Sequence, residues 1–208
     1  MGSQFIFVVE TNKKCNSDWI YIKDTLEHFY TYERTRVKLS VVYMDGRGNY
    51  NNKKKEKEIK RLISQYKATS KNNQSKVIYC FDCDEYDNNP DDSKFLEDAK
   101  KYCDDRGYEF VWFCKDVERV YIDKKVDDSQ KKKEATTFKA KKLITKVDTK
   151  RLSVDSYRTN TSNIMNVLDR HQELARKKWK NKDGDRIGYQ QMVRIIFRSY
   201  LVISVHTL

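Results

Sequence analysis

The chain has 208 residues and a formal net charge of +12, and its composition is 38% apolar, 36% charged and 12% aromatic. A disordered or fibrous protein is excluded, because this many large apolar side chains can form a core. No apolar run reaches the roughly 18 residues of a membrane-spanning helix, and five cysteines without regular spacing indicate reduced thiols, so we expect a cytoplasmic protein without membrane contact.

The first part of the chain repeats a strand-then-helix pattern. Residues 4–10 form a short apolar run that ends in Glu10, and their β-branched and aromatic content predicts a strand buried on both faces. Apolar residues at helical spacing follow over residues 17–30 and predict a helix. Residues 37–44 repeat the apolar run, and residues 59–66 repeat the helical spacing within a lysine-rich surface.

The pattern occurs a third time and is followed by one more strand. Residues 77–81 are apolar, Asp and Ser side chains near residue 91 predict the start of a helix, and residues 108–113 supply a fourth strand. This alternation predicts an α/β fold with a parallel four-stranded sheet and flanking helices. We expect this domain to span residues 1–125.

Residues 126–208 are expected to form a basic, mainly helical C-terminal extension. Apolar spacing predicts a clear helix near residues 164–175 and a weaker one over residues 134–145. Residues 190–205 are apolar enough for either a helix or a strand, and their periodicity leaves both open.

The positive charge is concentrated in this extension. Residues 1–123 carry 22 basic and 22 acidic side chains, whereas residues 124–208 carry 21 and 9. The asymmetry favours a polyanionic partner, because each phosphate neutralised by Lys or Arg releases counterions, although a surface that only aids solubility is the alternative. The run Lys53–Lys57 is more typical of a loop or a frayed helix than of a motif. We expect a nucleic-acid backbone to contact Lys131, Lys132, Lys133, Lys139, Lys141 and Lys142.

Carboxylates stand where the predicted strands end. Glu10 ends the first strand, while Asp82 and Asp84 follow the third and can point the same way because they lie two residues apart. The carboxyl ends of parallel strands meet at one edge of a sheet, so these three groups could surround one cleft and hold Mg²⁺ or Mn²⁺. Such a metal could activate water for phosphodiester cleavage. Arg47, in a turn that would overlook the same cleft, could meet a phosphate.

Two of these segments resemble the signatures of Toprim domains. Residues 5–10 read Phe-Ile-Phe-Val-Val-Glu and are followed by Ser17-Asp18-Trp19, and residues 79–84 read Tyr-Cys-Phe-Asp-Cys-Asp. The best match is to the RloB-like proteins and other Toprim nucleases of phage-defence systems, which are related to the OLD nucleases. In that group a further strand leads to a short segment containing Glu, and residues 111–118, ending in Glu118, resemble it.

The resemblance implies a metal-dependent endonuclease that cleaves RNA such as tRNA, or DNA, as the effector of an anti-phage defence system. Glu10, Asp82 and Asp84 would bind Mg²⁺ or Mn²⁺, and Glu118 would assist catalysis. A partner ATPase is also implied, and self-association is left open. The alternative is a catalytically inactive module that binds nucleic acid or protein, because Thr11 stands where Toprim domains commonly have a glycine.

Overall fold

The computed structural model describes residues 1–177 of the chain. The first of the two units of the chain spans Met1–Ala175, and the elements from β1 to α6 all belong to it. The apolar segment 190–205 lies outside the described residues, as does the end of the predicted extension.

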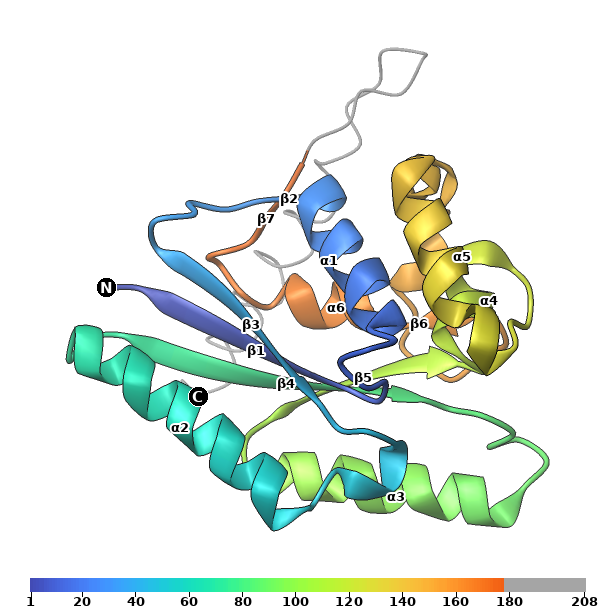
Figure 1. Cartoon of the computed structure of the whole chain (residues 1–208), viewed down its shortest axis with the longest axis horizontal. Coiled ribbons are helices and arrows are strands. Elements are labelled where there is room, and N and C mark those ends of the chain that lie inside the picture. The colour runs from blue at the N-terminus through green and yellow to red at the C-terminus, as the bar shows by residue number, and fades with distance from the viewer. Residues whose placement is uncertain (178–208) are drawn as a thin grey trace, which may run out of the picture. The chain divides into compact units, whose positions relative to one another are not determined.

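A five-stranded sheet forms the centre of the first unit, in the order β3-β1-β4-β5-β6 (Figure 1). The first four strands are parallel to one another, and β6 is antiparallel to β5. The prediction of an α/β fold with four parallel strands is confirmed, but the sheet has a fifth strand that was not predicted, because two residues are too few to show a pattern. The strands are β1 (Ser3–Val9), β3 (Val37–Tyr43), β4 (Gln74–Asp82), β5 (Glu109–Cys114) and β6 (Thr161–Ser162).

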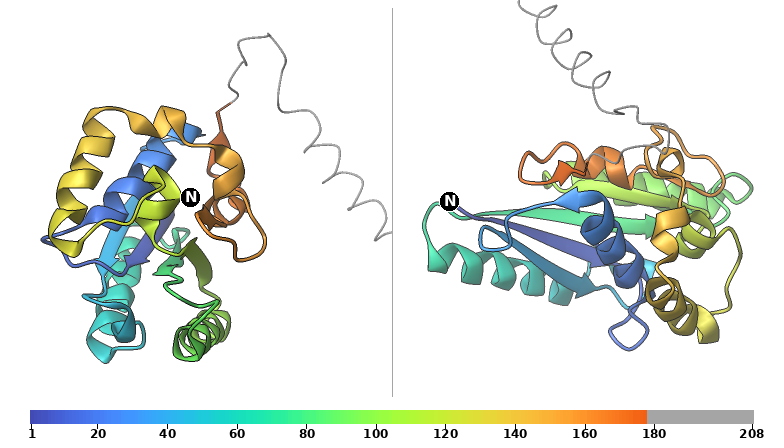
Figure 2. Two further views of the ribbon diagram at one scale, coloured as in Figure 1. Left: turned by 90° about the vertical axis from the view of Figure 1, so that its right-hand side faces the viewer. Right: turned by 90° about the horizontal axis from the view of Figure 1, so that it is seen from above.

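Helices cover both faces of the sheet (Figures 1 and 2). One face carries α2 (Lys53–Thr69) and α3 (Pro90–Asp104), which lie side by side. The opposite face carries α1 (Ser17–Phe29), α4 (Val117–Ile122), α5 (Asp128–Ala140) and α6 (Ile164–Leu168). The short elements are β2 (Tyr30–Thr31), β7 (Ala175–Arg176) and three 3₁₀ turns: η1 (Arg47–Asn49), η2 (Leu143–Lys146) and η3 (Thr149–Leu152).

The core consists of two layers, one on each side of β1. All seven residues of β1 are buried, and successive side chains point to opposite faces. Phe5 and Phe7 belong to the cluster beneath α1, whereas Ile6 and Val8 belong to the cluster on the side of α2 and α3. The strand therefore reads as a continuous apolar run because both of its faces need apolar contacts.

Residues 126–175 belong to the same compact unit as the predicted domain of residues 1–125. Phe138 of α5 is buried, and its ring lies 4.9 Å from that of Tyr21 of α1. Ala135 is fully buried on the same face of α5, so two apolar residues at i and i+3 attach this charged helix. The predicted helices are also displaced, since the first begins at Asp128 and ends at Ala140, and the second is limited to Ile164–Leu168.

Asn163 completes the hydrogen bonding of β5 where no strand pairs with it. β6 pairs only with Phe113 and Cys114. The Asn163 side chain accepts a hydrogen bond from the amide of Trp112 and donates one to the carbonyl of Phe110, each at 3.0 Å. The side-chain amide of Asn163 thus supplies the hydrogen bonds that a neighbouring strand would form at this edge.

We expect Asn163→Ala to lower the free energy of unfolding by about 3 kcal/mol, because it leaves one backbone donor and one acceptor of β5 unpaired. Urea denaturation followed by circular dichroism measures this. The matched control is Asn166→Ala, whose side chain donates to Asp155 at the surface and should matter little. Equal stability of the two variants would show that Asn163 does not support the sheet.

Candidate functional site

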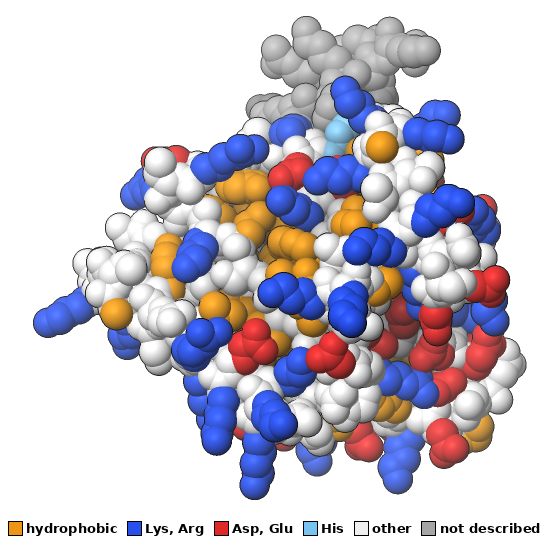
Figure 3. Space-filling view, viewed as in Figure 1, with side chains coloured by type: hydrophobic (Ala, Val, Ile, Leu, Met, Phe, Trp, Pro, Cys, Tyr) orange, Lys and Arg blue, Asp and Glu red, His pale blue; other side chains and the backbone are white. Residues whose placement is uncertain are grey.

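The predicted site lies at the edge of the sheet formed by the carboxyl ends of the parallel strands. Glu10 directly follows β1, Asp82 is the last residue of β4, and Glu118 lies in the first turn of α4 after β5. Asp and Glu side chains gather at this end of the molecule, on the right in Figure 3. Topology therefore brings residues that are more than 100 positions apart in the sequence to one edge.

Backbone amides position two of the carboxylates. The amide of Asp82 donates to Oε1 of Glu10 at 2.9 Å, and the amide of Val117 donates to Oδ1 of Asp82 at 3.0 Å. The first bond joins the ends of β1 and β4, and the second joins β4 to the start of α4. Two hydrogen bonds from backbone amides thus fix the carboxyl groups of Glu10 and Asp82 and link β1, β4 and α4.

Asp18 is a fourth member of the site that was not predicted as a site residue. It is buried in the first turn of α1, where it accepts hydrogen bonds from the amide of Thr11 at 3.0 Å and from the hydroxyl of Ser17 at 3.2 Å. Its position in the sequence could have indicated this role, because the first turn of a helix that follows a strand lies near the end of that strand. Thr11 supplies its backbone amide to this contact.

Asp18 and Glu118 are buried, Glu10 and Asp82 are half-buried, and the four carboxyl groups are close enough to repel one another. Burial, reinforced by Asp18 and Asp84, raises the pKa of Glu10 to about 8. Burial also raises the pKa of Asp82 well above its usual value, and the charges of Glu10, Asp18 and Glu118 raise it further. The carboxyl groups of this cluster cannot all be ionised at neutral pH unless a cation compensates their negative charge.

Glu118 has no hydrogen-bonding partner within the described part of the chain. Its side chain is fully buried, and neither carboxyl oxygen is paired. Burial raises its pKa to about 7, and the charge of Asp18 adds to this effect. An unpaired buried carboxyl group is costly, so its presence indicates that a ligand, such as a cation or a water molecule, completes the site.

Lys131 projects from α5 toward the same cluster. Burial lowers the pKa of Lys131, but the charges of Asp82 and Glu118 outweigh this and raise it overall. The ammonium group also forms an ion pair with Asp128 at 3.1 Å. The structure places Lys131 beside the carboxylates, and its predicted contact with nucleic acid stays a prediction.

Arg47 joins two acidic side chains at the rim of the site. Its guanidinium contacts Asp84 and Asp92 at 2.5 Å each and lies 4.8 Å from the ring centre of Phe95. A phosphate would therefore compete with two carboxylates for this guanidinium, and a metal would compete with it for Asp84. That Arg47 binds nucleic acid and that Asp84 binds a metal stay predictions.

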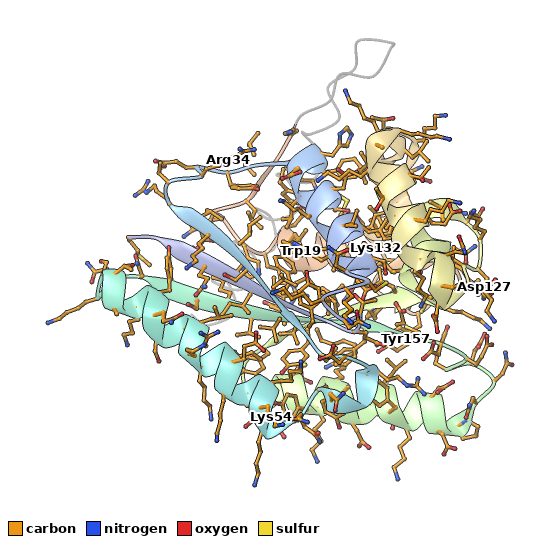
Figure 4. All side chains as sticks on the ribbon, viewed as in Figure 1. Trp19, Arg34, Lys54, Asp127, Lys132 and Tyr157 are labelled. Atoms are coloured by element: carbon orange, nitrogen blue, oxygen red, sulfur yellow. The ribbon has the colours of Figure 1, made fainter. Side chains whose placement is uncertain are left out.

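The other predicted nucleic-acid contacts divide into engaged and free lysines. Lys132 lies on α5 beside the start of α1, near Trp19 in Figure 4, and its ammonium donates to the carbonyl of Lys14 at 2.7 Å. Lys139 forms a long ion pair of 3.9 Å with Glu27. The remaining predicted contacts are Lys133, Lys141 and Lys142. Their side chains are exposed, and none forms an ion pair with another residue of the described range.

The donor set suits a hard divalent cation, although the side chains do not form a finished metal site. Within residues 1–177, no three His, Cys, Asp or Glu side chains are arranged to hold a metal ion. Carboxylate oxygens are nevertheless the ligands that Mg²⁺ and Mn²⁺ prefer, and both oxygens of Glu118 are unpaired. Glu10, Asp82 and Glu118 fit such an ion chemically, and they would have to turn toward it.

Comparison with known proteins does not add to this picture. The chain matches no protein-family model, no curated protein and no solved structure. None of the helices within residues 1–177 has the length and apolar character needed to cross a bilayer.

Proposed function

We propose that this chain is a metal-dependent endonuclease of Toprim type. The observation that carries the proposal is the set of carboxyl groups gathered at the carboxyl edge of the sheet, half-buried or buried, whose pKa values are raised by desolvation and by mutual repulsion. A divalent cation would relieve that repulsion, and its Lewis acidity would supply the chemistry of phosphodiester hydrolysis.

Each residue of the cluster would have a distinct part in this reaction. Glu10 and Asp82 would hold Mg²⁺ or Mn²⁺, because backbone amides already fix their carboxyl groups. Glu118, whose pKa is about 7, would accept the proton of the attacking water, since a general base works best when its pKa lies near the working pH. Lys131 would balance negative charge on the phosphoryl oxygens. Asp84 would act as a further metal ligand once released from Arg47.

The wider setting is part of the same proposal. The net charge of +12 supports a nucleic-acid substrate, either RNA such as tRNA or DNA. All five cysteines are free thiols, which supports a reducing compartment such as the cytoplasm. By its resemblance to the Toprim nucleases of phage-defence systems, the chain would be the effector of such a system, and a partner ATPase would control its activity.

A second candidate function is a catalytically inactive nucleic-acid-binding module. The observation that favours it is the presence of two built-in cations, because Lys131 faces the buried cluster and Arg47 is paired with Asp84. In such a module these side chains would take the place of a metal ion. The two candidates differ in whether a divalent cation changes any property of the protein.

The experiment is a cleavage assay with labelled tRNA, single-stranded RNA and duplex DNA, in the presence of Mn²⁺, Mg²⁺ or EDTA. We expect cleavage of at least one substrate with metal and none with EDTA. Glu10→Gln keeps the acceptor oxygen for the Asp82 amide but should lose activity, whereas Asp91→Asn, in the exposed first turn of α3, should cleave like the wild type. If no metal-dependent cleavage is seen, with or without a candidate partner ATPase, the result would favour the binding module.

A further inference from the structure

Helix α2 has one apolar face and one basic face. Asn52 is the N-cap residue, and its side chain accepts a hydrogen bond from the amide of Lys54 at 2.8 Å. The lysine run Lys53–Lys57 therefore forms the first turns of a capped helix and is not a frayed end. Ile59 is buried against the sheet, and Leu62 and Ile63 pack beside it. The opposite face of the helix is exposed to solvent.

The exposed face carries a regular stripe of cations. Of the residues in Lys53–Thr69, seven are basic and two are acidic. The stripe consists of cations at helical spacing, interrupted once at Ser64, and they lie along one side of the helix. From Lys53 to Arg61 successive levels are about 5 Å apart, and the whole stripe is about 21 Å long at 1.5 Å per residue. Its members are Lys53, Lys57, Lys60, Arg61 and Lys67.

Within the described chain no member of this stripe forms an ion pair, although the charge of Lys60 contributes to lowering the pKa of Glu56. The ion pairs of α2 involve only Lys55, which contacts Asp45, and Glu56, which contacts Arg106. Lys and Arg side chains project freely over α2, at the lower left of Figure 3. The lysines of α5 differ, because Lys131 and Lys132 are already engaged by other groups of the protein. The stripe on α2 is therefore a positive surface whose members form no ion pair within the described chain.

The neighbouring helix shows that this surface is not a general property of the fold. Helix α3 covers the same face of the sheet, but it has three basic and five acidic residues. Its Lys100 pairs with Asp104 at 2.6 Å. A polyanion would be attracted to α2 and repelled by much of α3.

The stripe also begins near the carboxylate site. Helix α2 follows β3 through the turn that contains η1, and the amide of Gly46 in that turn donates to the carbonyl of Glu10 at 2.8 Å. Arg47 of η1 contacts Asp84. The basic stripe thus starts at the end of the sheet where the carboxylates lie and runs away from it along α2.

We infer that the exposed face of α2 binds the sugar-phosphate backbone of a nucleic-acid strand and leads it to the carboxylate site. The destination of the strand rests on the proposed function, but the binding surface itself does not. Lysine and arginine side chains spaced by about 5 Å can each reach a phosphate of a strand, because phosphates repeat every 3.4 Å or so along a duplex strand and the side chains are long. This surface is distinct from the track predicted on α5.

The test compares two triple variants that remove the same charge from neighbouring helices. The first is Lys57→Gln with Lys60→Gln and Lys67→Gln on α2. The control is Lys94→Gln with Lys100→Gln and Lys101→Gln, which are exposed residues of α3. Binding of labelled single-stranded RNA and of duplex DNA is measured by fluorescence anisotropy in EDTA over a range of KCl concentrations, with circular dichroism to confirm that helicity is retained.

The expected result is a loss of affinity of about tenfold or more at low salt for the α2 variant, and a salt-dependence slope smaller by about 2, since each lost contact with a single strand removes roughly 0.7. The control should keep the wild-type slope. Equal slopes for the two variants would overturn the inference, as would a wild type that binds neither nucleic acid. Because EDTA prevents catalysis, failure of cleavage leaves this readout unchanged, and Glu10→Gln should bind like the wild type.

Discussion

Asp82→Asn should lower metal-dependent cleavage by about 1,000-fold without unfolding the protein, because a metal ion contributes several kcal/mol to the transition state and each 1.36 kcal/mol is a factor of ten. The structure explains why the fold should survive. Asn keeps the oxygen that accepts the hydrogen bond of the Val117 amide. It also removes a half-buried carboxyl group whose ionised form Glu10 and Asp18 repel.

The measurement pairs cleavage rates with thermal unfolding in the presence and absence of Mn²⁺. For the wild type we expect Mn²⁺ to raise the melting temperature, because a ligand that binds only the folded state stabilises it. Asp82→Asn should lose this shift together with activity. The matched control is Asp98→Asn on the exposed side of α3, which should keep both. A variant at position 82 that kept the full Mn²⁺ shift would show that Asp82 is not a ligand.

The cation-free protein should be less stable at pH 8 than at pH 6.5, by about 2 kcal/mol, because one pKa unit corresponds to 1.36 kcal/mol. Burial raises the pKa of Glu10 to about 8 and that of Glu118 to about 7 in the folded protein, from an ordinary value near 4.5. Between the ordinary pKa near 4.5 and the raised pKa values of the folded protein, the folded state holds protons that the unfolded state has released. The free energy of unfolding therefore falls as the pH rises through this range. Above about pH 8 this contribution is lost.

Urea denaturation in EDTA at the two pH values measures this effect. The comparison starts at pH 6.5 because burial lowers the pKa of His171 to about 4, and that group has the opposite effect on stability between pH 4 and 6.5. Glu118→Gln should show a smaller difference between the two pH values than the wild type. Saturating Mn²⁺ should cancel the difference, because it binds the ionised carboxylates. Stability that rises toward pH 8 in EDTA would contradict the prediction.

Part of the site could be predicted because it depends on strand ends. Apolar runs show where β1 and β4 stop, and parallel topology places their carboxyl ends at one edge. Glu10 and Asp82 could therefore be chosen without knowing how the side chains pack. The participation of Asp18 and Lys131 could not be predicted in the same way, because it depends on the direction of α1 and on how α5 docks against it.

The roles of the basic residues are even harder to predict from the sequence than those of the carboxylates. The sequence indicates that the chain is cationic, and it locates the excess charge after residue 123. It does not show which cations are neutralised, because the partners of Arg47 and Lys131 come from other segments. Only the folded structure distinguishes these paired side chains from the unpaired stripe on α2.

By itself the sequence determined the α/β class, the four parallel strands and the strand-end carboxylates, because each of these follows from local hydrophobic pattern and from the rules of parallel sheets. The tertiary structure decided how far the compact unit extends and how β5 is completed at its edge. Both depend on a few contacts, such as Phe138 against α1 and Asn163 against the backbone of β5, whose partners lie far away in the chain. Such contacts leave no periodic signal in the sequence, since their energy comes from burial and hydrogen bonds formed only after folding.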